Sequence, residues 1–95
     1  MKLRFEWDDE KDRKNIKKHG VSFTEAELVF YDPKRYEIYD EEHSIMEKRW
    51  ITVGLSGWKI LKVSFTERRS HIRIISVKKA DKNYEEVYFY GYNKT

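Results

Sequence analysis

Hydrophobic and polar residues alternate at the start of the chain, and this alternation predicts a short β-strand over residues 2–7. A very polar segment follows, with an aspartate able to cap a helix over residues 9–18 and Gly20 able to end it. Only Ile16 and His19 are expected to face a core from this helix. One flank of the helix is therefore expected to be widely solvated.

A second helix has a clearer beginning. Ser22 and Glu25 form the S-x-x-E capping box, in which each side chain bonds the backbone N–H of the other residue. Apolar residues then recur at helical spacing as far as Phe30. The helix is expected to end at Asp32-Pro33, because proline cannot continue it.

The rest of the chain has the pattern of four further strands and a last helix. The strands are expected at residues 35–39, 48–55, 59–66 and 71–77, and the helix at 82–90. In the last strand, two sets of apolar residues, at 72 and 74 and at 75 and 77, compete for the buried face. The order β-α-α-β-β-β-β-α predicts one α+β domain over residues 1–95, with an antiparallel sheet and helices packed on one face.

The first hairpin between the central strands can be given a register. A three-residue loop at 56–58 places Val53 opposite Leu61 and keeps the apolar faces of the two strands together. A two-residue loop at 56–57 places Val53 opposite Ile60 and mixes the faces. The three-residue loop is therefore the prediction.

The same argument applied to the second hairpin gathers reactive side chains. A three-residue loop at 68–70 would place Glu67 opposite His71 and Phe65 opposite Arg73. The side chains expected to converge at this end of the sheet are Arg49, Glu67, His71 and Arg73, with Arg68 and Arg69 on the loop.

A carboxylate among guanidinium groups suits the cleavage of a phosphodiester. The carboxylate of Glu67 would take the proton of a 2′-hydroxyl, while arginines bind the phosphate and neutralise developing charge. The alternative, which spacing alone favours, is that Glu67 pairs with Arg68 or Arg69 in a solvated turn.

The charge of the chain supports a polyanionic partner. The net charge is +3, but residues 44–80 carry nine basic and two acidic side chains, a local net charge of +7. Such a segment is typical of nucleic-acid binding. The absence of cysteine excludes disulfides and thiol chemistry. Because no apolar run approaches the roughly 20 residues of a membrane span and no secretory segment is visible, we expect a cytoplasmic protein.

Histidines and acidic residues offer few metal ligands. No pair of histidines has zinc-ligand spacing, and His43 is a candidate general acid or phosphate contact. The segment from Asp40 to His43 could hold a hard cation, but an exposed acidic turn is the favoured interpretation. No glycine-rich phosphate loop or nucleophile elbow is present. The chemistry is therefore expected to need neither a metal ion nor a cofactor.

Short motifs occur in order from residue 5 to about residue 88. They are Phe5-Glu6-Trp7-Asp8, Asn15, Lys18-His19-Gly20-Val21-Ser22-Phe23, Glu25-Ala26, Val29-Phe30, Asp32-Pro33, Asp40, His43-Ser44, Glu47, Arg49, Gly54-Leu55-Ser56, Thr66-Glu67-Arg68, Ile72-Arg73-Ile74-Ile75-Ser76, Ala80, Glu85 and Tyr88. In this order and spacing the chain resembles the BrnT-type toxins of bacterial type II toxin–antitoxin modules.

The resemblance implies an endoribonuclease toxin with a RelE-like fold that binds RNA on a basic sheet surface. The family's active-site positions map to Glu67, Arg68 and Arg73, and Arg49 and His43 are further candidates. The other basic residues expected to bind RNA are Lys62, Arg69, His71, Lys78 and Lys79. The expected reaction is attack by the 2′-hydroxyl, which leaves a 2′,3′-cyclic phosphate.

The resemblance also implies a partner. It is a BrnA-type antitoxin with a ribbon-helix-helix part, which assembles as two toxins with two antitoxins and alone contacts operator DNA. The last helix departs from the family, because it is aromatic and acidic where members are usually arginine-rich. RNA contacts from that helix are thus in doubt, and its contacts with the antitoxin are expected to differ. The competing hypotheses are a non-catalytic nucleic-acid-binding module and a pure protein-interaction subunit.

Overall fold

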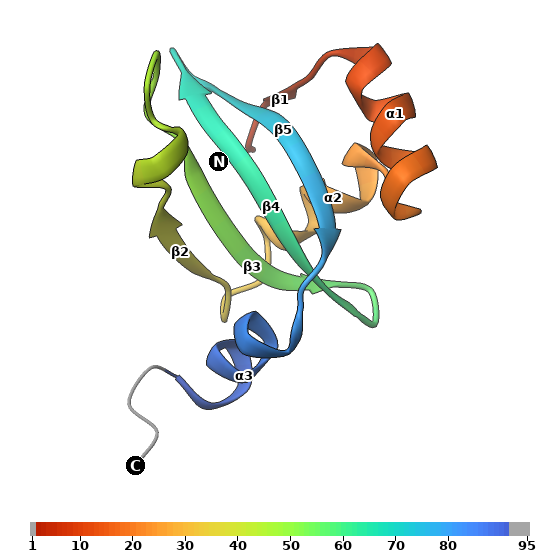
Figure 1. Cartoon of the computed structure of the whole chain (residues 1–95), viewed down its shortest axis with the longest axis vertical. Coiled ribbons are helices and arrows are strands. Elements are labelled where there is room, and N and C mark those ends of the chain that lie inside the picture. The colour runs from red at the N-terminus through yellow and green to blue at the C-terminus, as the bar shows by residue number, and fades with distance from the viewer. Residues whose placement is uncertain (1, 92–95) are drawn as a thin grey trace.

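The computed structural model describes residues 2–91, which form a five-stranded sheet with three α-helices (Figure 1). The elements in chain order are β1 (Phe5–Glu6), α1 (Asp9–His19), α2 (Phe23–Val29), β2 (Tyr36–Tyr39), the 3-10 helix η1 (Glu41–His43), β3 (Trp50–Ser56), β4 (Lys59–Arg68), β5 (His71–Lys79) and α3 (Lys82–Tyr90). The predicted α+β class is confirmed. The predicted acidic turn contains the short helix η1.

The sheet is mixed, so the prediction of an antiparallel sheet is wrong at one edge. Its strand order is β1-β5-β4-β3-β2, and β1 runs parallel to β5, with Phe5 paired to Ile72. Phe5 also packs edge-on against Phe30 at a ring-centroid distance of 5.3 Å. Tertiary packing of this kind decides where β1 joins the sheet. The alternation of residues along a strand does not indicate whether the strand runs parallel or antiparallel to its neighbour.

The helices do not all lie on one face, and that prediction is also wrong. Helix α2 lies behind the sheet in Figure 1 and α1 lies beside its β5 edge, whereas α3 lies at one end of the opposite face, which we call the open face. The Tyr36 hydroxyl on β2 donates to the Tyr84 carbonyl of α3 at 2.7 Å. Val53 points away from α2, toward the open face, and is nevertheless fully buried. Burial of this side chain is the physical reason for the position of α3.

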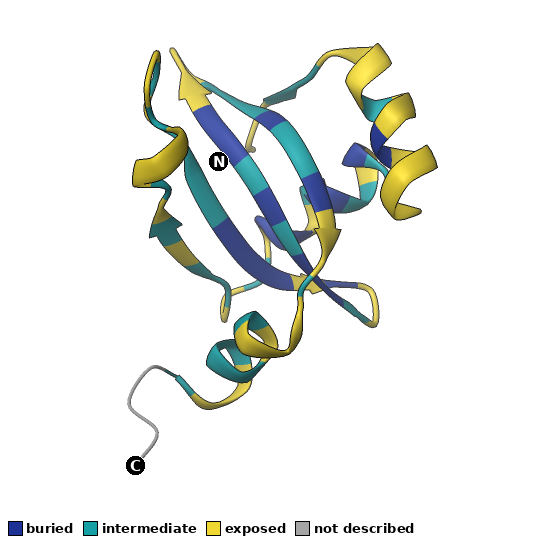
Figure 2. Cartoon of the chain, viewed as in Figure 1, coloured by how far each residue is buried: buried dark blue, intermediate teal, exposed yellow. Residues whose placement is uncertain are grey.

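The core lies between the sheet and α2 (Figure 2). Its buried residues are Val21, Phe23, Ala26, Val29, Phe30, Leu61, Val63, Phe65, Ile74 and Val77. Phe30 and Phe65 pack edge to face at 5.0 Å between ring centroids. The capping box of Ser22 and Glu25 is present as predicted, and it begins the helix that carries this core.

Helix α1 is attached by a polar residue. Asn15 is 7% exposed, whereas Ile16 is 44% exposed, so the expectation that Ile16 faces a core is wrong. The Asn15 amide nitrogen donates to the carbonyls of Val21 at 2.9 Å and Val77 at 2.8 Å, and its oxygen accepts from the Val77 N–H at 3.1 Å. The side chain thus takes the place of a neighbouring strand beside β5, beyond the end of β1.

The first hairpin has a two-residue turn, Gly57-Trp58, in place of the predicted three-residue loop. Ser56 pairs with Lys59 and Val53 with Lys62. Gly54 faces α2 where the prediction had Val53. A Cβ at Gly54 would lie only 3.0 Å from the Val29 side chain, which is too close for ordinary packing. The backbone of β3 therefore approaches α2 closely, and only glycine permits this approach.

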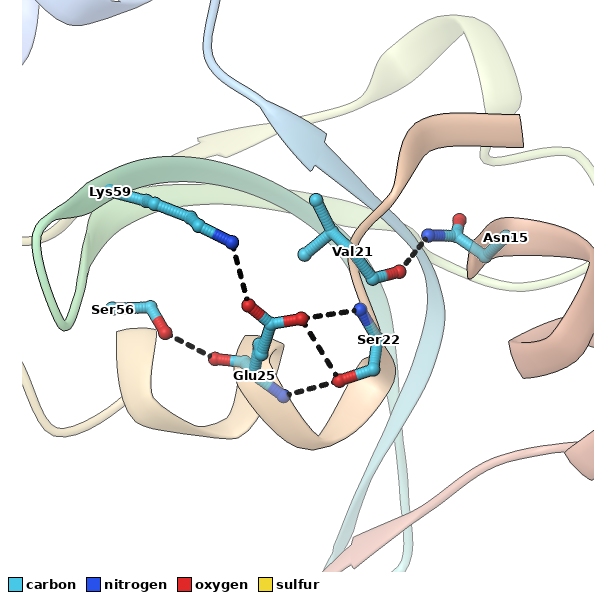
Figure 3. Close-up of polar contacts among 6 residues, drawn as sticks. All are labelled: Asn15, Val21, Ser22, Glu25, Ser56 and Lys59. Atoms are coloured by element: carbon cyan, nitrogen blue, oxygen red, sulfur yellow. Dashed lines mark hydrogen bonds and ion pairs between the residues drawn. The ribbon is translucent and has the colours of Figure 1, made fainter. Parts of the chain in front are cut away.

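Polar contacts of the first hairpin connect it to the start of α2 (Figure 3). The Ser56 hydroxyl donates to the Glu25 carbonyl at 2.8 Å, and the Lys59 amine lies 3.0 Å from a Glu25 carboxylate oxygen. The Glu25 carboxylate also accepts from the Ser22 N–H at 3.0 Å. These bonds hold Ser56 on the helix-facing side and so favour the observed register.

The second hairpin also differs from its predicted register. Arg68 pairs with His71 across the two-residue turn Arg69-Ser70, and Arg69 adopts a left-handed φ of 57°. Glu67 consequently pairs with Ile72, and Phe65 pairs with Ile74 instead of Arg73. The pairing shifts by one residue between Ser64 and Phe65, where β5 contains the extra residue Ile75. Residues 72, 74 and 77 therefore all lie on the helix-facing side.

Candidate functional site

Three arginines gather on the open face, at the end of the sheet formed by the β4–β5 turn. Phe65 faces the core, so its neighbour Thr66 faces the open side, together with its partner Arg73. Arg68, two residues further along β4, shares that side, and Arg49 enters it just before β3. We call Arg49, Arg68 and Arg73 the arginine cluster.

Two carboxylates pair with members of this cluster. The Arg68 Nε and one of its terminal nitrogens each lie 3.2 Å from an oxygen of Glu47. A terminal nitrogen of Arg73 lies 3.2 Å from Glu6. The hydrogen bond from Arg68, and then the charges of Arg49 and Arg73, hold the pKa of Glu47 below its usual value. The cluster is therefore a compact set of positive groups with a fixed carboxylate on two of them.

Glu67 does not join the arginine cluster. It lies on β4 between Thr66 and Arg68, and strand alternation therefore directs it to the helix-facing side, where its pair partner is Ile72. The predicted opposition of Glu67 and His71 is wrong, because the turn is one residue shorter than expected. His71 instead pairs with Arg68 at the end of the sheet where the arginine cluster lies.

His43 lies beside Arg49 in a groove of the open face. The groove has a volume of about 290 Å³, and we call it the central groove. Its lining includes His43, Arg49, Lys62, Ser64, Ser76 and Tyr84. A pocket that Glu47 also lines contains His43 and Arg49 as well, so the groove continues toward the arginine cluster.

Asp40 orients His43. The His43 Nδ1 lies 2.9 Å and 3.1 Å from the two oxygens of the Asp40 carboxylate. The loop is tied to β3 by Ser44, whose hydroxyl donates to the Asp40 carbonyl at 2.6 Å and accepts from the Arg49 N–H at 2.8 Å. No residue in the range 2–91 forms a hydrogen bond or ion pair with the Nε2 of His43, and a histidine held in this way suits proton transfer.

The basic residues predicted to bind RNA divide between two places. Lys62 lines the central groove and lies 4.6 Å from the centre of the Tyr84 ring. Lys78 pairs with Lys62 and is exposed. Arg69 is exposed in the β4–β5 turn, next to the arginine cluster. Lys79 lies elsewhere, with its amine 5.9 Å from the centre of the Trp58 ring.

Sequence reasoning missed three acidic members of this surface. Glu6 reaches Arg73 only because β1 joins the sheet next to β5, which no local pattern indicates. Glu47 belongs to the motifs quoted above, but its pairing with Arg68 depends on the loop before β3. Asp40 belongs to the predicted acidic turn. Its position three residues before His43 is the signal in the sequence that indicates their pairing.

Within residues 2–91, no three His, Asp or Glu side chains are grouped so that they could hold a metal ion. Over the same residues, no helix has the length and apolar character needed to cross a membrane.

Comparison with known proteins identifies the family. A family model described as "Ribonuclease toxin, BrnT, of type II toxin-antitoxin system" matches residues 7–83 of the 95-residue chain. A search of curated proteins finds no match. The matched segment includes all three members of the arginine cluster as well as Asp40, His43 and Glu47. The chain therefore belongs to the BrnT family of ribonuclease toxins of type II toxin–antitoxin systems.

Proposed function

We propose that this protein is an endoribonuclease that cleaves RNA on its open face without a metal ion, and that a protein antitoxin inhibits it. Membership of a ribonuclease toxin family supports the reaction class. The observation that carries the proposal is the arginine cluster beside a groove that contains an oriented histidine. We expect the protein to act in the cytoplasm, where its RNA substrate is found.

The arginine cluster supplies the binding site for the scissile phosphate. Arg68 already holds a carboxylate through two nitrogens, which is the geometry in which guanidinium binds phosphate. An incoming phosphate would take the place of the Glu47 or Glu6 oxygens. Because the guanidinium groups are already oriented by these carboxylates, little reorganisation accompanies the charge that develops in the transition state.

His43 is the group we propose for proton transfer. Its Nε2 removes the proton of the 2′-hydroxyl, whose oxygen attacks the adjacent phosphorus. The bond from phosphorus to the 5′-oxygen breaks, and this oxygen is protonated by the imidazolium or by water. The products are a 2′,3′-cyclic phosphate and a 5′-hydroxyl. Such proton transfer contributes roughly 10²–10⁴-fold in rate.

Glu67 is the base proposed from the sequence, where His43 is a candidate general acid or phosphate contact. Its position opposite Ile72, on the helix-facing side, supports His43 over Glu67 in this role. Lys62, Lys78, Arg69 and His71 are proposed to bind RNA along the open face, whereas Lys79 is better placed for another contact. Positive charge from three arginines supports catalysis without a metal ion.

Cleavage in the presence of excess EDTA tests the proposal. Purified protein should cut single-stranded RNA and leave cyclic phosphate ends, detected by their resistance to phosphatase until acid treatment. Arg73→Ala and His43→Gln should each lose at least about 100-fold in rate, while Glu67→Gln should stay within a few-fold of wild type. If Glu67→Gln alone abolishes cleavage, the base is Glu67. If cleavage needs added magnesium, the proposed mechanism is wrong.

The family supports a protein antitoxin as partner. We propose a BrnA-type antitoxin with a ribbon-helix-helix part, two copies of which bind two toxins, and which alone contacts operator DNA. Light scattering of the complex purified after co-expression with the adjoining reading frame would give its mass. A mass other than that of a two-plus-two assembly would contradict this stoichiometry.

A further inference from the structure

A second groove lies on the other side of α3 from the central groove. It runs between α3 and the β3–β4 turn and has a volume of about 1000 Å³. Its apolar lining is formed by Leu55, Trp58, Ile60, Ala80, Tyr88 and Phe89, and we call it the Trp58 groove. None of the roles proposed above for RNA cleavage uses these residues.

The walls of the Trp58 groove expose an unusual amount of apolar surface. Trp58 is 81% exposed, Phe89 61% and Leu55 40%. Two-residue hairpin turns normally carry glycine, asparagine or aspartate, so tryptophan is an unexpected residue in this turn. A single exposed apolar residue needs no explanation, but several around one groove are typical of an interaction site.

The base of the groove is held in shape by polar contacts. The Tyr88 hydroxyl donates to Oδ2 of Asp32 at 2.6 Å, and Oδ2 of Asp32 also accepts from the Leu55 N–H at 2.8 Å. Ile60, beneath them, is 8% exposed. These bonds fix α3 against the end of β3. A ligand therefore meets a largely preformed site, which lowers the entropic cost of binding.

The rim of the groove carries three lysines and two carboxylates, those of Asp32 and Glu85. Lys34, Lys59 and Lys79 line it, and the amines of Lys59 and Lys79 lie 5.6 Å and 5.9 Å from the centre of the Trp58 ring. The Asp32 carboxylate is already engaged by three donors, including the Lys34 N–H at 2.9 Å. The three lysines outnumber the two carboxylates, so the rim has a small net positive charge that favours an acidic partner.

We propose that the antitoxin anchors itself in the Trp58 groove through an apolar segment flanked by acidic residues. The inference rests on the proposed function, because it presupposes a protein antitoxin. Helix α3 connects the two grooves: Tyr84 lines the central groove, and Tyr88 and Phe89 line the Trp58 groove. An acidic partner that covers the basic open face crosses α3 and reaches the Trp58 groove. Binding energy would then come from a place separate from the cleavage site.

Affinity measurements with the purified product of the adjoining reading frame test this inference. Trp58→Ser and Phe89→Ser should each weaken its binding about 30-fold or more, as expected for central aromatic anchors. Lys34→Glu should weaken binding and reduce its dependence on salt. The matched control is Leu28→Ser on α2, since Leu28 is also an exposed apolar residue, at 54%, but does not line the groove. RNA cleavage by every variant without the antitoxin should equal that of wild type.

Four outcomes separate the alternatives. If Trp58→Ser and Phe89→Ser bind the antitoxin as tightly as wild type, the groove is not the anchor and the inference is wrong. Loss of RNA cleavage in these variants would assign the groove to RNA. Dimerisation of the wild-type protein alone, abolished by Trp58→Ser, would assign it to a second copy. If wild type does not cleave RNA but the variants still lose the antitoxin, the proposed function fails while the docking site stands.

Discussion

Arg68 and Glu47 form an ion pair through two nitrogens and two oxygens, each at 3.2 Å, within the arginine cluster. The carboxylate occupies the guanidinium edge that a phosphate group needs. In an exposed pair of this kind, the contribution to stability is small. We infer that its main effect is on ligand binding, where the carboxylate both orients Arg68 and competes with RNA.

Glu47→Gln should strengthen RNA binding. The substitution removes a negative charge next to Arg68, Arg49 and Arg73, so the dissociation constant for a non-cleavable RNA should fall a few-fold at low salt. Fluorescence anisotropy at several salt concentrations would measure it. Glu27→Gln on α2 is the matched control, since it makes the same charge change on the other side of the sheet. Equal or weaker binding by Glu47→Gln would show that orientation of Arg68 outweighs competition.

The same carboxylate predicts a pH effect. Because the pKa of Glu47 is lowered, its pair with Arg68 persists as pH falls through the usual range of a glutamate and is lost only below it. RNA affinity of wild type should therefore rise at acidic pH relative to Glu47→Gln, once Glu47 is protonated. Parallel affinity profiles of the two proteins down to the acid limit of folding would contradict this prediction.

Asp40→Asn should reduce turnover without reducing RNA affinity. Asp40 contacts His43 Nδ1 through its carboxylate and does not itself reach the substrate in the proposed mechanism. Losing this orientation should lower kcat about 10-fold to 100-fold. Single-turnover rates and the affinity for a non-cleavable RNA would separate the two effects. Asp81→Asn is a control for charge. Asp81 caps α3, and asparagine caps a helix about as well as aspartate, so this variant loses the same charge and keeps the helix. An unchanged pH–rate profile and kcat would remove Asp40 from the mechanism.

Tyr88 should make the docking of α3 sensitive to alkaline pH. Burial, and then the hydrogen bond to Asp32, raise the pKa of Tyr88 from 10.0 to about 12. A raised pKa means that the folded state favours the neutral phenol, so the contribution is complete below pH 10 and is lost as pH rises through about 12. Tyr88→Phe should cost about 1 kcal/mol at neutral pH.

The measurement is urea unfolding of both proteins at a series of pH values. The stability difference between wild type and Tyr88→Phe should shrink between pH 10 and pH 12. A constant difference over this interval would mean that folding does not raise the pKa of Tyr88.

Asn15→Ala should destabilise the whole domain. The substitution leaves the Val77 N–H, the Val77 carbonyl and the Val21 carbonyl without their side-chain partner in a buried place. We expect a loss of about 2–4 kcal/mol, since unsatisfied buried groups cost about 1–3 kcal/mol each before water enters. Thermal unfolding would measure it, with the exposed Asn83→Ala on α3 as the control. A loss below that of the control would show that water replaces the amide.

Local patterns in the sequence determined the elements of the fold. The capping box of Ser22 and Glu25, the aspartates before α1 and α3, and Gly20 predicted where the three helices begin or end. Alternation predicted the five strands, and the charge of residues 44–80 indicated a polyanionic partner. These features depend on residues close together in the chain, so a single sequence contains them.

Tertiary structure alone decided which side chains meet. Gly54 lets α2 approach β3, Ser56 binds the Glu25 carbonyl, and the resulting two-residue turn shifts the register by one residue from the prediction. In the second hairpin, a shift of the same size turns His71 and Arg73 to the open face, while Glu67 stays with Phe65 on the helix-facing side. Because side chains alternate between the two faces of a strand, one residue is enough to exchange the members of a site.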